Sequence, residues 1–107
     1  MTEKINLANH QENLERGCIL RCESNVDNQV DAVDLMIIEL NINKEREYAL
    51  LIITGYKAGL IYTILPKESF PSTEEGHVID IEWLRSNWNK WGYLGFAEKD
   101  VYVIKNA

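Results

Sequence analysis

Two stretches in the middle of the chain are apolar on both of the faces that a β-strand would present. In residues 33–42 and 47–56 apolar side chains fill consecutive positions, as they do from Leu35 to Ile38. Strands of this kind usually lie inside a sheet and are covered on both sides. The polar residues 43–46 predict a hairpin loop between them, so we expect two neighbouring central strands.

Further strands are predicted before and after this pair. Residues 18–23 alternate between an apolar face that carries both cysteines and a polar face, which predicts a half-exposed strand. The polar residues 24–30 predict a loop. Gly59 permits the positive φ of a tight turn before a strand at 60–65, and residues 100–105 predict a closing strand.

One helix is predicted after a long polar loop. Asp80 is a suitable N-cap, and Gly92 ends the helix in the C′ position. Core packing accounts for Trp88 and Trp91, whereas Trp83 lies about 100° away on the helix and is the most free to face outward. The apolar residues recur at intervals of three, four and three and share one helix face: Ile81, Leu84, Trp88 and Trp91.

These elements indicate an α+β fold in a single domain over residues 1–107. We expect an antiparallel meander of about five strands, with one Trp-rich C-terminal helix packed on the sheet. The irregular pattern of residues 2–16 is compatible with a short N-terminal helix that ends at Gly17. One helix covers only one face of a sheet, so either the N-terminal segment or a partner must shield the other face.

The charge of the chain limits the classes of partner. The 107 residues carry a formal net charge of -6. Nucleic-acid binding depends on Lys and Arg that neutralise phosphates, and anionic membranes attract basic segments, so we expect neither partner. The sequence also contains no apolar run typical of a signal peptide or a membrane span, and we expect a cytoplasmic location.

Cys18 and Cys22 are the two cysteines of the chain. On a strand their Cα atoms would lie about 13 Å apart, which is too far for a disulfide bond. On a helix they would share a face, but the alternating pattern favours a strand. We therefore expect two small buried side chains with free thiols.

Nothing in the sequence predicts catalysis. Neither of the two histidines is accompanied by an evident nucleophile or positioned carboxylate. His77 with Glu74, Glu75 and Asp80 could be drawn as a divalent-metal site, but carboxylates in an exposed loop are usually just solvated. The glycines match no nucleotide-binding motif. We predict a protein without enzymatic activity, with no catalytic residue, metal site or cofactor.

Carboxylates are concentrated in two segments. Residues 22–43 contain five of them and neither Lys nor Arg, and residues 66–82 contain five with Lys67 as the one cation. Solvation is a sufficient explanation for any single carboxylate. Together, the two segments are expected to give one face a negative potential that steers a cationic partner.

Four segments, read in order, indicate a family. They are GYKAGL at 55–60, LPKES at 65–69, IEWLRSNWNKWGY at 81–93 and DVYVI at 100–104. Residues 50–105 thereby resemble the small bacterial immunity proteins encoded beside polymorphic toxins, including those of contact-dependent growth inhibition. The chain departs from the family pattern after the helix, where Leu94-Gly95 stands in place of an aromatic residue followed by proline.

The resemblance implies a cytoplasmic antidote that binds a toxin domain and has no enzymatic activity. Because a nuclease has a basic cleft, we expect a stoichiometric inhibitor of a basic nuclease or RNase domain. Buried aromatic anchors would set its residence time; the candidates are Tyr48, Tyr56, Phe70 and Trp83. The predicted partner-binding carboxylates form one cluster of Glu23, Asp27, Asp31 and Asp34 and a second of Glu74 and Glu75.

The competing hypothesis is a binding module for a small ligand or single-stranded nucleic acid. In it, Trp83 and the tyrosines line a pocket on which a base or ring stacks. An oligonucleotide titration separates the two hypotheses, because the net negative charge predicts no binding.

Overall fold

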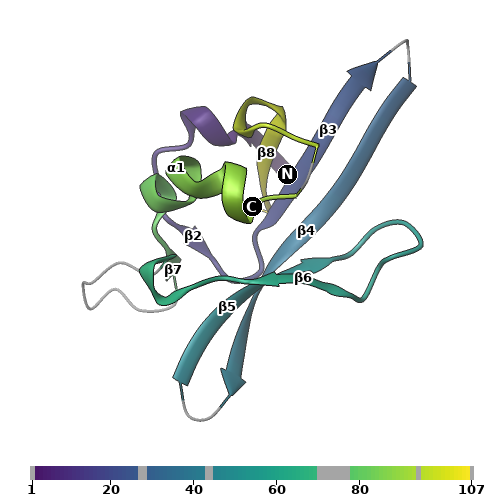
Figure 1. Cartoon of the computed structure of the whole chain (residues 1–107). Helices are drawn as coiled ribbons and strands as arrows, with labels where there is room; N and C mark the ends of the chain where they lie inside the picture. Colours follow the sequence, from purple (N-terminus) through teal and green to yellow (C-terminus); the bar gives the residue numbers. More distant parts are fainter. Residues whose placement is uncertain (1, 27–28, 43–44, 70–77, 94, 107) are drawn as a thin grey trace.

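The computed structural model describes residues 2–26, 29–42, 45–69, 78–93 and 95–106 (Figure 1). It has an α+β architecture, as predicted, with mostly antiparallel strands and one α-helix. The elements are β1 (Thr2–Asn6), η1 (Leu7–Asn9), β2 (Leu14–Glu15), β3 (Ile19–Val26), β4 (Gln29–Ile42), β5 (Glu45–Ile52), β6 (Ile61–Ile64), η2 (Lys67–Ser69), β7 (Val78–Ile79), α1 (Ile81–Trp91), η3 (Glu98–Asp100) and β8 (Val101–Asn106).

Six strands form one antiparallel sheet in the order β1-β8-β3-β4-β5-β6, and β2 pairs with β7 in a second, two-stranded sheet. Strands β3 to β6 are the predicted meander. The sheets contain more strands than the five expected, because β1, β2 and β7 were not recognised as strands. The helix is not the C-terminal element either, since η3 and β8 follow α1 in the chain.

The N-terminal segment also differs from the prediction. A short helix was expected between residues 2 and 16, but β1, the three-residue 3-10 helix η1 and β2 occupy that range. Strand β1 is held by its ladder with β8, in which Thr2 lies opposite Asn106. This pairing joins distant parts of the sequence, so the local pattern carries no sign of it.

The hairpin between β3 and β4 is longer than predicted. Residues 24–30 were expected to form a loop, but β3 continues to Val26 and β4 begins at Gln29. The cross-strand ladder continues through Ser24 opposite Asp31. Backbone pairing therefore keeps this polar sequence extended, despite side chains that favour turns.

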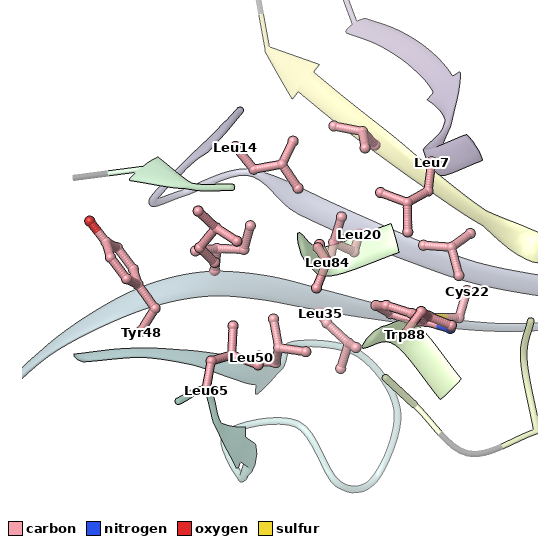
Figure 2. Close-up of a cluster of buried hydrophobic side chains, with 14 of the residues drawn as sticks. Leu7, Leu14, Leu20, Cys22, Leu35, Tyr48, Leu50, Leu65, Leu84 and Trp88 are labelled. Atoms are coloured by element: carbon pink, nitrogen blue, oxygen red, sulfur yellow. The ribbon is translucent and has the colours of Figure 1, made fainter. Parts of the chain in front are cut away.

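The core lies between one face of the large sheet and α1, which packs across it (Figures 1 and 2). Alternating positions of the strands point inward, as period-two patterning requires. Leu84 and Trp88 project from the helix onto them, and the indole Nε1 of Trp88 donates to the carbonyl of Phe96 at 2.9 Å. The buried sheet residues on this face are Leu20, Cys22, Leu35, Ile37, Tyr48, Leu50, Ile52, Val101 and Val103.

The helix begins and ends as the sequence predicts. Asp80 caps the N-terminus, and Gly92 follows the last turn. However, Gly92 has a φ of -79° and does not use the left-handed conformation expected of a C′ glycine. A Cβ atom at this position would overlap the indole ring of Trp88. Glycine is therefore needed here for close packing against Trp88.

The tryptophans differ in their burial. Trp88 is 1% exposed and belongs to the core, as predicted. Trp91 is only partly buried, and Trp83, expected to face outward, is also partly buried and packs against the core. The rings of Trp83 and Trp91 lie 6.4 Å apart in a tilted arrangement, so the stretch mainly supports packing.

The other face of the large sheet, here called the second face, carries the intervening residues of the strands. Its apolar members come into register across four strands, from Ile19 through Met36 and Leu51 to Ile61. Among the residues described, none of these side chains joins the cluster that α1 covers. Strand β1 extends the edge of the sheet, so the N-terminal segment does not fold over this face.

Candidate partner-binding site

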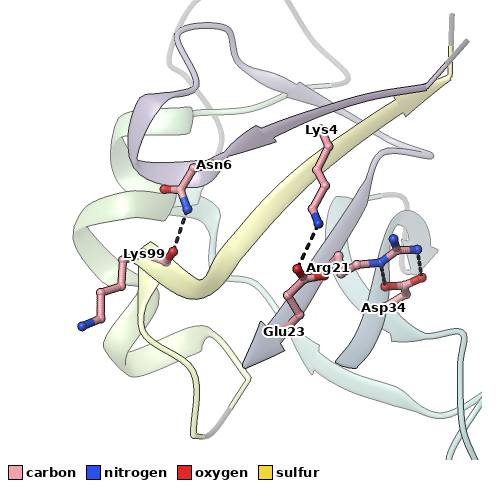
Figure 3. Close-up of polar contacts among 6 residues, drawn as sticks. All are labelled: Lys4, Asn6, Arg21, Glu23, Asp34 and Lys99. Atoms are coloured by element: carbon pink, nitrogen blue, oxygen red, sulfur yellow. Dashed lines mark hydrogen bonds and ion pairs between the residues drawn. The ribbon is translucent and has the colours of Figure 1, made fainter. Parts of the chain in front are cut away.

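Two of the predicted partner-binding carboxylates lie on the second face, and each is paired within the chain (Figure 3). Glu23 Oε1 accepts from Lys4 Nζ at 2.9 Å. The carboxylate of Asp34 binds the Arg21 guanidinium through two hydrogen bonds, of 2.8 and 3.0 Å. The register of β3 and β4 places Arg21 directly opposite Asp34. Internal cations therefore offset part of the negative charge that the sequence placed in this cluster.

The Arg21–Asp34 pair is the better protected of the two. Asp34 is 9% exposed, and its backbone N–H also donates to Thr54 Oγ1 at 3.0 Å. The hydrogen bonds to Asp34 raise the pKa of Arg21 against the opposing effect of its partial burial. Bidentate pairing of this geometry fixes both side chains, so Asp34 helps to hold β3 and β4 together.

The other predicted carboxylates cannot be placed in the same way. Asp31 lies on β4 opposite Ser24, but its side chain is not among those described. Asp27, Glu74 and Glu75 lie outside the described residues. The assignment of all six carboxylates to partner contact stays a prediction.

A pocket with a volume of about 390 Å³ lies where the β3–β4 hairpin meets the turn after β5 and the segment after α1. Aromatic rings form much of its wall, and four hydroxyl groups, two of them phenolic, and one ammonium group belong to its lining side chains. Its lining residues are Ser24, Val33, Ile52, Thr54, Gly55, Tyr56, Lys57, Tyr93, Gly95 and Phe96. Residues from several distant segments thus combine at one place.

The turn between β5 and β6 projects from the sheet (Figure 1), and its residues Thr54 to Lys57 line the pocket. Gly55 and Gly59 have φ angles of 77° and 98°, which confirms the positive φ predicted for Gly59. Backbone hydrogen bonds close the turn: Gly59 N–H donates to Ile52 at 2.7 Å, and Ile52 N–H donates to Leu60 at 2.9 Å. Tyr56 lies in this turn and is 94% exposed.

The four aromatic anchor candidates differ in their exposure to solvent. Tyr48 is 1% exposed and belongs to the core, and Trp83 is partly buried against it. Phe70 lies outside the described residues. Tyr56 alone of the described candidates offers its ring to solvent.

Sequence reasoning missed the contribution of the segment after α1. Tyr93 packs on Tyr62 with ring centroids 4.9 Å apart, and Phe96 lies 6.0 Å from Tyr93. The one feature of the sequence that could have indicated it is the pair of aromatic residues, Tyr93 and Phe96, just after the end of the helix. The sequence did not indicate that they would turn back toward the β3–β4 hairpin. Trp83, which the competing hypothesis places in a ligand pocket, is absent from the lining of this one.

Neither metal binding nor a membrane span is indicated by the described part of the chain. It contains no group of three or more His, Cys, Asp or Glu that could hold a metal ion, and no helix long and apolar enough to cross a membrane. His10 is buried at 3% exposure, and its Nδ1 lies 2.8 Å from the carbonyl oxygen of Glu12. His77, with Glu74 and Glu75, lies outside the described residues.

Comparison with known proteins gives one match. A family model described as Immunity protein 45 matches residues 7–103. No curated protein and no solved structure gives a significant match to the chain.

Proposed function

The chain belongs to the Immunity protein 45 family, and from this membership we propose that it neutralises a cognate toxin domain by forming a stoichiometric complex with it. The family match over residues 7–103 is the observation that carries the proposal. The chain acts by occupancy and transforms no substrate of its own.

We further propose that the toxin domain is a basic nuclease. The support is electrostatic: the chain has a net charge of -6, and a domain that grips RNA or DNA carries a cationic cleft that carboxylates can fill. The proposed contacts are Glu23, Asp27, Asp31, Asp34, Glu74 and Glu75. Glu23 and Asp34 are already paired with Lys4 and Arg21, so part of their negative charge is offset within the chain.

Titration of the toxin tests the proposal. The toxin domain encoded beside this chain is purified, and its cleavage of RNA and DNA is measured while the chain is added in steps. We expect activity to fall linearly to zero at one equivalent, and co-expression of the chain to rescue cells that carry the toxin. A non-cognate toxin domain is the control and should stay active. Cell death despite an excess of the chain, or turnover of substrate by the chain alone, would contradict the proposal.

A further inference from the structure

Tyr56 combines high exposure with a fixed backbone. Its side chain is 94% exposed, while the turn that carries it is closed at both ends by the hydrogen bonds of Ile52, Gly59 and Leu60. A large apolar ring in water gains nothing for the fold. A ring held on a rigid turn loses little further entropy on binding, which is typical of interface anchors.

The pocket beside Tyr56 is better suited to a side chain than to a free small molecule. Its volume of about 390 Å³ lies near the lower end of small-molecule sites, which range from roughly 300 to 1,000 Å³. Such sites orient their ligand through several convergent polar groups. Here the Thr54 hydroxyl already accepts from Asp34 N–H, and the side chains of Tyr56 and Lys57 are exposed to solvent. The hydroxyls of Ser24 and Tyr93 are the remaining polar side-chain groups of the lining.

The chemistry of the lining identifies the kind of side chain that fits. Val33, Ile52, Tyr93 and Phe96 offer apolar and aromatic surface. Lys57, whose Nζ lies 5.7 Å from the centre of the Tyr56 ring, places a cation at the same site. This ammonium group disfavours a cationic guest, so an aliphatic or aromatic side chain is the matching occupant.

We propose that Tyr56 and this pocket form the centre of the toxin interface, with an apolar side chain of the toxin domain inserted into the pocket and packed against the Tyr56 ring. The inference rests on the proposed function, which supplies the partner. It adds that apolar anchoring at this site sets the lifetime of the complex, while the net negative charge of the chain sets the rate of encounter.

Affinity measurements on two site variants test this inference. Tyr56→Ala removes the exposed ring, and Ser24→Trp fills the pocket from β3. Leu60→Ala is the matched control, because Leu60 is 58% exposed on the same turn and does not line the pocket. Circular dichroism and thermal melting of each variant confirm that it is folded. Binding kinetics are measured by surface plasmon resonance with an immobilised, catalytically inactive form of the toxin domain encoded beside the chain.

Tyr56→Ala and Ser24→Trp should each weaken the Kd by about 30-fold or more, mainly through faster dissociation, whereas Leu60→Ala should change it less than about threefold. Wild-type affinity in both site variants would overturn the inference and leave the proposed function standing. Failure of the wild-type chain to bind would overturn both. A small molecule found in the native mass spectrum of wild type and lost from Ser24→Trp, with unaltered toxin binding, would assign the pocket to a ligand and also overturn it.

Discussion

At the residue scale, neighbouring positions of β3 serve opposite faces of the sheet. Arg21 reaches across the second face to Asp34, while Cys22 is fully buried beneath α1. Burial raises the pKa of the Cys22 thiol to about 12, and the negative charge of Asp34 adds to the effect. Cys22 is therefore a neutral, protected side chain in the folded protein. Both cysteines are free, as predicted from their alternating pattern.

The raised pKa of Cys22 predicts a loss of stability in alkaline solution. The unfolded thiol releases its proton around its ordinary pKa of 9.0, whereas the folded thiol keeps it until about 12. The folded state thus binds more protons in this window, and the free energy of unfolding falls as pH rises through it. Between about pH 8 and pH 10 the ionisation of the thiol should lower the free energy of unfolding by about 1 kcal/mol.

Urea denaturation at both pH values measures this effect. Cys22→Ala lacks the thiol and should lose about 1 kcal/mol less than wild type over the same interval, although the smaller side chain lowers its stability at every pH. An equal loss in the two proteins would show that other groups carry the alkaline dependence.

At the scale of elements, two side chains cap the start of α1. Asp80 Oδ1 accepts from the backbone N–H groups of Glu82 and Trp83, at 2.9 and 3.3 Å. Asn13 Oδ1 accepts from Ile81 N–H at 3.0 Å. Three of the N–H groups that a helix leaves open are thus satisfied by side chains. Asn13 also ties the N-terminal segment to the helix.

Removal of the Asp80 cap should destabilise the chain. Asp80→Ala leaves two N–H groups without their acceptor and is expected to lower the free energy of unfolding by about 1 kcal/mol, whereas Asp80→Ser should retain most of it. Thermal and urea denaturation, followed by circular dichroism, measure the difference. Equal stability of the Ala and Ser variants would mean that Asn13 and water satisfy the helix start without this carboxylate.

Elements defined by neighbouring residues were predictable, and those defined by distant partners were not. The helix from Ile81 and the turn at Gly59 follow from local spacing and caps. Strand β1 depends on β8, nearly the whole chain away, so a strand looked like an irregular helix. The candidate site shows the same limit, because Ser24, Thr54 and Phe96 meet only in the folded molecule.

At the scale of the whole molecule, carboxylates outnumber cationic side chains and the net charge is -6. Some of these carboxylates are neutralised by ion pairs within the chain. Lys4 and Arg21 pair with Glu23 and Asp34 on the second face. Reversing Asp34 to Lys would leave two cations facing each other, so it would test folding as much as binding. Charge steering is better tested at carboxylates outside these two ion pairs.

The double variant Asp27→Lys/Asp31→Lys should slow association with the toxin domain and flatten its dependence on salt. Each reversal weakens the negative potential that attracts a cationic surface, and the loss should reach about tenfold at low ionic strength. Stopped-flow fluorescence at several salt concentrations measures the rate. Glu12→Lys/Glu15→Lys is the matched control, because it changes the net charge equally at two exposed positions that lie outside both acidic segments. The same slowing in both variants would indicate that total charge matters and the hairpin does not.

The position of β8 between β1 and β3 has a consequence for synthesis. While a ribosome is still translating residues 101–106, β1 has no neighbour in the sheet and β3 has only β4. The nascent chain can assemble its β3–β6 meander early. The place between β1 and β3 is filled only when residues 101–106 have left the exit tunnel. Protection of the producing cell therefore begins after this segment emerges. A stop codon before it would yield a protein that lacks β8 and has no strand to join β1 to β3.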